Sequence, residues 1–134
     1  MTIATIRAAL ESRLNGISPA LPTAWENVEY TPTTGTAWQR VNLLINDPVD
    51  YAVTSDVVEQ RGFLQVTLFY PRGAGTATAT ARADAVATRF APVQTLTSGA
   101  TNVEILKTAS IGGGTIVEEW FVIPVSIPWR SFTA

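Results

Sequence analysis

One segment, VVEQRGFLQVTLFY at positions 57–70, constrains the fold more than any other part of the chain. Successive side chains of a β-strand point to opposite faces, so this alternating pattern predicts a strand that ends at Pro71. One face of the strand is apolar and is made of Leu64, Val66, Leu68 and Tyr70. The opposite face mixes aromatic and polar side chains and is made of Phe63, Gln65, Thr67 and Phe69. We therefore expect the first face to look into the core.

The rest of the chain predicts two helices and three further strands. The first helix runs from Thr2, a suitable N-cap, to about Asn15, and the second covers the alanine-rich stretch 76–90. The further strands are expected at 37–46, 102–108 and 115–129, and residues 17–36 form an ordered loop with at most one short strand, between Trp25 and Tyr30. This order predicts an α+β fold, in which an antiparallel sheet of about four strands has two helices packed on one face. With 134 residues, we expect a single domain over 1–134.

The last predicted strand carries an almost continuous apolar face, which only Glu119 interrupts. Pro124 and Pro128 have the same parity within it, so both missing N–H donors fall on one side of the strand. We therefore expect the C-terminal half of this strand to be unpaired on that side.

Composition excludes much catalytic chemistry. The chain has no cysteine and no histidine, which removes thiolate metal sites, disulfides and the usual general base. Its net charge is −2, Lys107 is its only lysine, and its arginines are scattered, so binding to nucleic acid through a basic patch is not expected. No apolar run is long enough to span a membrane, and the N-terminal segment lacks a signal-peptide pattern. We expect no enzyme activity, no cofactor and a cytoplasm-like place of synthesis.

Several local patterns resemble sites but have simpler interpretations. Gly73–Gly75 and Gly112–Gly114 are typical of turns. The first segment precedes a predicted helix, as a phosphate loop does, but it lacks the lysine of that motif. Glu118 and Glu119 are neighbours in a predicted strand and would point to opposite faces, so they cannot act as a catalytic pair. The connection between the predicted strands 37–46 and 57–70, together with the start of the second strand, is acidic and contains Asp47, Asp50, Asp56 and Glu59. The spacing of these residues fits no calcium loop.

The second face of the predicted sheet is the best candidate for a functional surface. It carries Trp38, Arg40, Leu44, Phe63, Phe69, Trp120 and Val122. Both helices are expected on the other face, which leaves two interpretations. Either loop 17–36 folds over these side chains with Trp25 and Tyr30, or they form an exposed aromatic patch that contacts another subunit or a partner.

Four stretches of the chain together resemble a known family. They are TIRAALESRL, LPTAWENVEYTPTTGTAWQRVNLL, EQRGFLQVTLFYPRGAGTATATARADAVATRF and the closing VIPVSIPWR. The combination is similar to the tail terminator-like proteins of long-tailed phages and prophages, from the first helix to Trp129.

This resemblance implies a structural role in the virion. Such proteins form a ring, typically a hexamer, that caps the tail tube, stops its polymerisation and meets a connector at the head. The implied partners are further copies of the chain, the major tail tube protein and the head-side connector, at the head-proximal end of the tail. A neck or head-completion protein is the alternative, since such proteins share the size and acidity of this chain.

A ring through which DNA passes favours an acidic or neutral lumen, because like charge repels phosphate. The acidic residues Asp47, Asp50, Asp56 and Glu59 are therefore candidates for the lumen lining.

Overall fold

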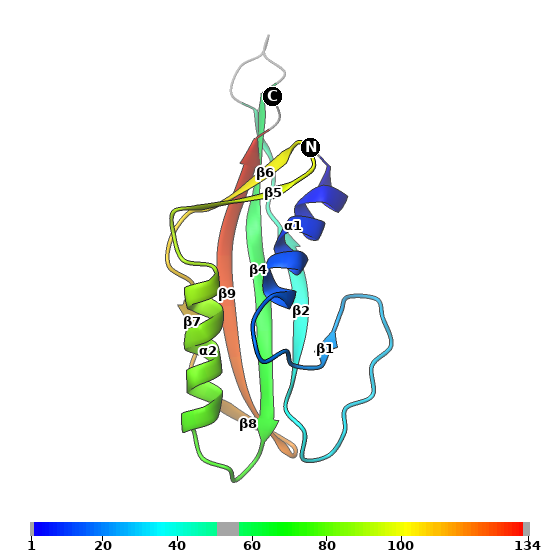
Figure 1. Cartoon of the computed structure of the whole chain (residues 1–134), viewed down its shortest axis with the longest axis vertical. Helices are drawn as coiled ribbons and strands as arrows, with labels where there is room; N and C mark the ends of the chain where they lie inside the picture. The colour runs from blue at the N-terminus through cyan, green and yellow to red at the C-terminus, as the bar shows by residue number, and fades with distance from the viewer. Residues whose placement is uncertain (1, 51–56, 133–134) are drawn as a thin grey trace.

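The computed structural model describes residues 2–50 and 57–132, and in this part of the chain nine strands form one mixed sheet with two helices (Figure 1). The elements are α1 (Ile3–Asn15), β1 (Thr23–Ala24), β2 (Trp38–Ile45), β3 (Val49–Asp50), β4 (Val58–Pro71), α2 (Ala77–Arg89), β5 (Gln94–Ser98), β6 (Thr101–Ile105), β7 (Ser110–Ile111), β8 (Thr115–Val117) and β9 (Trp120–Phe132). The prediction of an α+β fold, with an antiparallel sheet of about four strands and two helices packed on one face, is wrong. The protein is mostly β, and β1 runs parallel to β2. Four of the strands have only two or three residues, too few to show an alternating pattern in the sequence.

The centre of the sheet is formed by β2, β4 and β9, in the strand order β1-β2-β4-β9-β6-β5. Three valines show the register, since Val41 lies opposite Val66 and Val66 lies opposite Val125. All three are buried in the main core, as are Leu64 and Leu68. The apolar face predicted for 57–70 is therefore confirmed.

Both helices contribute their buried residues to this same core. In α1 the predicted cap is present, because the Thr2 side chain accepts a hydrogen bond from the Thr5 N–H and the Thr5 side chain accepts one from the Thr2 N–H. In α2 the buried apolar residues are Ala79, Ala83 and Val86, and Phe90 at its C-cap is buried beside them. Neither helix in the described residues has the length and apolar content required to cross a membrane.

The chain reverses direction at Glu118 and Glu119, so the predicted strand 115–129 is in fact two strands. Glu118 has a φ of 54°, in the left-handed region used by tight hairpin turns, and β8 pairs back onto the start of β9. Glu119 interrupts the apolar alternation because it lies in this turn.

The two prolines of β9 face the side that pairs least. On its other side β9 pairs with β4 along its whole length, whereas β8, β7 and β6 each pair with only two or three of its residues. The Pro124 carbonyl accepts from the Gly112 N–H at 2.8 Å, although its own nitrogen cannot donate. The expectation that the C-terminal half of this strand is unpaired on the proline side is wrong, because β7 pairs there with Val125 and Ser126 and β6 pairs with Trp129 and Arg130. The missing N–H donors only divide that side among short partner strands.

A hairpin of β5 and β6 completes the sheet, and only its second strand had been predicted. The sequence of β5, QTLTS, has a single buried apolar residue, Leu96. Such a polar edge strand is specified by its pairing with β6 and its contact with α1, which local periodicity does not reveal.

Candidate assembly surfaces

Three residues of the second sheet face lie side by side across the three central strands. Trp38 of β2 lies opposite Phe69 of β4, which lies opposite Val122 of β9. The Trp38 and Phe69 rings stack with their centroids 4.0 Å apart, and Trp120 meets Trp38 edge-on at 6.0 Å. These four side chains are buried and form a second, smaller core cluster, which we call the aromatic cluster.

The loop between β1 and β2, residues 25–37, covers part of this cluster and is called the arm. Tyr30 packs on Trp38 with ring centroids 5.2 Å apart, and Ala24 at the end of β1 also contacts the cluster. Trp25 instead packs against the main core. The covering expected from loop 17–36 is therefore present, with Tyr30 and without Trp25.

The other part of the second face is open. Leu44 and Phe63 are cross-strand neighbours with exposed fractions of 46% and 37%. Arg40 is exposed and places its guanidinium 5.2 Å from the centre of the Phe69 ring, a cation–π contact. The seven residues singled out from the sequence thus divide into a covered cluster of four and three exposed residues.

Glu26 fastens the arm to the open edge of β2. Its carboxylate accepts hydrogen bonds from the Leu43 backbone N–H and from Arg7 Nη1, the latter at 3.1 Å. Burial alone would raise the pKa of Glu26, but the Leu43 hydrogen bond and the Arg7 charge outweigh it and lower the pKa below its usual value. The contact occupies an edge N–H that would otherwise be open to another strand.

The four acidic candidates have different surroundings. Asp47 and Asp50 are exposed, and Asp56 lies outside the described residues. Glu59 is buried, and its carboxylate lies 3.5 Å from Arg61 Nε and 3.7 Å from Arg130 Nη1. Its charge is balanced within the chain, and in the described part of the chain no three acidic side chains gather as a metal site.

Sequence reasoning missed one further surface, along β7 and β8. Ile111, Ile116 and Val117 are all exposed there, at the outer side of β9. The available signal was the adjacency of Ile116 and Val117, because two neighbouring apolar residues in a strand cannot both face one core.

The family model for the phage tail terminator protein matches residues 5–129 of the chain. The chain belongs to the phage tail terminator family. The family resemblance seen in the sequence is therefore confirmed, and this terminator is a component of a phage tail with a structural role.

Structural comparison agrees in fold. One solved structure superposes on this terminator with a TM-score of 0.80 and 26% sequence identity, and the match covers 100% of this chain and 97% of the other. No curated protein matched the terminator's sequence.

Proposed function

We propose that this terminator forms a closed ring, a hexamer, that caps the tail tube, ends tail polymerisation and presents a joining surface to a head-side connector. The observation that carries the proposal, beside the family, is that the two lateral sides of the subunit are unlike. The arm stands out from the β1–β2 side of the sheet (Figure 1), with Val28 60% exposed, whereas the exposed apolar residues of β7 and β8 lie beyond β9. A contact between unlike surfaces repeats around a rotation axis and closes into a ring when the angle permits.

The open part of the second face supplies a further contact surface in this proposal. Leu44 and Phe63 form a small apolar area beside the exposed Arg40, which resembles the composition of protein interfaces. We assign it to contact with a neighbouring subunit or with the tail tube protein. Trp38, Phe69, Trp120 and Val122 lie beside it on the same face and hold the arm in place.

Removal of the protein tests the function directly. Electron micrographs of a phage or prophage that lacks it are expected to show overlong tails, because polymerisation has no stop. Tails of normal length beside unjoined heads would instead identify a neck or head-completion protein. The natural protein supplied in trans should restore normal tails.

The lumen assignment is tested separately. Reversal of Asp47, Asp50 and Asp56 to lysine is expected to slow DNA ejection while rings still assemble, since the substituted lysines would bind phosphate. Unchanged ejection would remove these residues from the lumen.

A further inference from the structure

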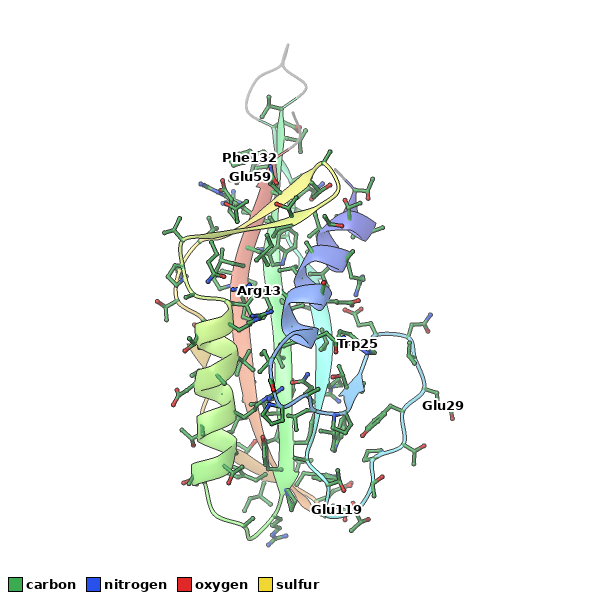
Figure 2. All side chains as sticks on the ribbon, viewed as in Figure 1. Arg13, Trp25, Glu29, Glu59, Glu119 and Phe132 are labelled. Atoms are coloured by element: carbon green, nitrogen blue, oxygen red, sulfur yellow. The ribbon has the colours of Figure 1, made fainter. Side chains whose placement is uncertain are left out.

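Two arginines join the C-terminal ends of the helices. Arg13 Nε donates to the Arg89 carbonyl oxygen at 3.0 Å, and Arg89 Nε donates to the Arg13 carbonyl oxygen at 2.9 Å. Each guanidinium thus satisfies a carbonyl at the end of the other helix. This arrangement brings two positive charges together, with Arg13 labelled in Figure 2 between the helices.

These guanidiniums lack a counter-ion inside the described part of the chain. None of its ion pairs involves Arg13 or Arg89, and the further donor Arg13 Nη2 bonds only to the neutral Gln94 side chain at 3.1 Å. Burial and the positive charge of Arg89 both lower the pKa of Arg13. Both side chains are half-buried, so water screens part of the repulsion between the two cations, and a carboxylate bound between them would offset more of it.

A third arginine adds to the excess of positive charge on α2. Arg82 lies two turns before Arg89, is only 7% exposed, and bonds through Nη1 to the Pro19 carbonyl. Its Nε and Nη2 have no hydrogen-bond partner in the described residues. A carboxylate that docks near such a buried guanidinium gains a favourable electrostatic interaction with it.

A cavity of about 320 Å³ opens beside Arg13 and Arg89. The hydroxyl side chains of Ser12, Thr95 and Thr97 line it, and of these Thr97 already donates to Asn102 Oδ1 at 3.1 Å. Guanidinium and hydroxyl groups are among the donors that bind a carboxylate in proteins, and arginine can bind it with two parallel hydrogen bonds.

The arm offers a carboxylate of the right kind. Glu29 is exposed near the outer reach of the arm (Figure 2), and within the described residues it forms no ion pair or hydrogen bond. The arm follows β1, the first strand of the sheet order, whereas the cavity includes Thr95 of β5, the last strand. The cavity itself lies where the two helices end (Figure 2), so the arm and the receptor are different surfaces of one subunit, as the two halves of a head-to-tail contact between copies must be.

We propose that Arg13 and Arg89 bind the Glu29 carboxylate of the neighbouring subunit, so that each arm docks on the helix ends of the next copy. The proposal rests on the ring proposed above and names the ion pair that closes it. The docked carboxylate supplies the negative charge that the helix junction lacks.

The test uses trans complementation of the deletion phage, with tail length measured by electron microscopy. Glu29→Arg and Arg89→Glu are each expected to reduce tails of normal length at least about tenfold, since a partly buried ion pair becomes a repulsion. Coexpression of the two variants should restore normal tails. In an alternating ring, the natural arm of one variant meets the natural receptor of the other, and the two reversed charges meet each other.

Matched controls separate docking from folding. Glu119→Arg and Arg72→Glu reverse exposed charges at the opposite end of the sheet and should complement normally. Because Arg89 also caps α1, Glu29→Arg is the decisive single variant, and thermal unfolding must show that it folds. Full complementation by folded Glu29→Arg, or no gain from coexpression when thermal unfolding shows that both variants fold, would overturn the inference.

Other ligands and other failures give different results. Fluorescence anisotropy with duplex DNA tests for a phosphate site. If the natural protein binds the DNA, and the Arg89→Glu variant does not bind it but still gives tails of normal length, the site binds phosphate and the proposal is overturned. If the natural protein itself fails to restore tail length, the proposed function fails instead.

Discussion

The indole of Trp38 and the ring of Phe69 lie almost parallel, with 5° between their planes and 4.0 Å between their centroids. They are neighbours on adjacent strands, on the sheet face opposite the main core. Tyr30 of the arm packs on Trp38, so the stacked pair anchors the arm to the sheet.

Phe69→Ala should reduce the free energy of unfolding by about 3–5 kcal/mol, since a buried aromatic ring is lost and a cavity remains. Phe63→Ala is the matched control, on the same strand and face but exposed, and should cost about 1 kcal/mol or less. Urea unfolding followed by tryptophan fluorescence measures both. Equal costs would contradict a separate aromatic core.

Gly62 is required because β2 and β4 approach closely there. A Cβ added at Gly62 would lie 2.0 Å from the Leu44 carbonyl oxygen, which is backbone and cannot move aside. Gly62→Ala is therefore expected to destabilise the protein by roughly 1–3 kcal/mol or more. Gly113→Ala, where nothing lies within 4 Å, should be neutral or slightly stabilising in the same thermal unfolding experiment.

Glu26 should make stability depend on pH in the acid range. Its pKa is lowered in the folded protein from a reference value of 4.5, so the carboxylate stabilises the fold fully above that value. This contribution is lost as the pH falls from 4.5 through the lowered pKa, because protonation favours the unfolded chain. The difference in unfolding free energy between the natural protein and Glu26→Gln should shrink over this window. A difference that stays constant during acid titration would show that Glu26 is not linked to folding.

Glu59 should contribute more to stability than its neighbour Glu104. Glu59 is buried between Arg61 and Arg130, so Glu59→Gln is expected to cost about 1–3 kcal/mol. Glu104 bonds to Arg130 at 2.6 Å, but both side chains are 38% exposed, and Glu104→Gln should cost only about 0.2–1 kcal/mol. Thermal unfolding at low and high salt distinguishes them, since salt should weaken only the exposed pair appreciably.

Local sequence patterns were sufficient for the long elements. Alternation in 57–70 identified β4 and its buried face, and Thr2 identified the start of α1, because both signals arise from neighbouring residues. The same parity correctly placed Trp38, Phe69 and Val122 on one face of the sheet. The turn at Glu118 was missed because its positive φ is held by the pairing of β8 with β9.

The sequence by itself determined the three central strands, the two helices, the lack of histidine and cysteine chemistry, and the family. Tertiary structure alone decided which side chains are covered and which charges are balanced. Tyr30 covers Trp38, Glu59 meets Arg130, and among the residues that the structure describes no carboxylate pairs with Arg13 or Arg89. The residues that form these pairs come from different elements. Sequence periodicity depends only on residues that are close in the sequence, so it cannot predict such pairs.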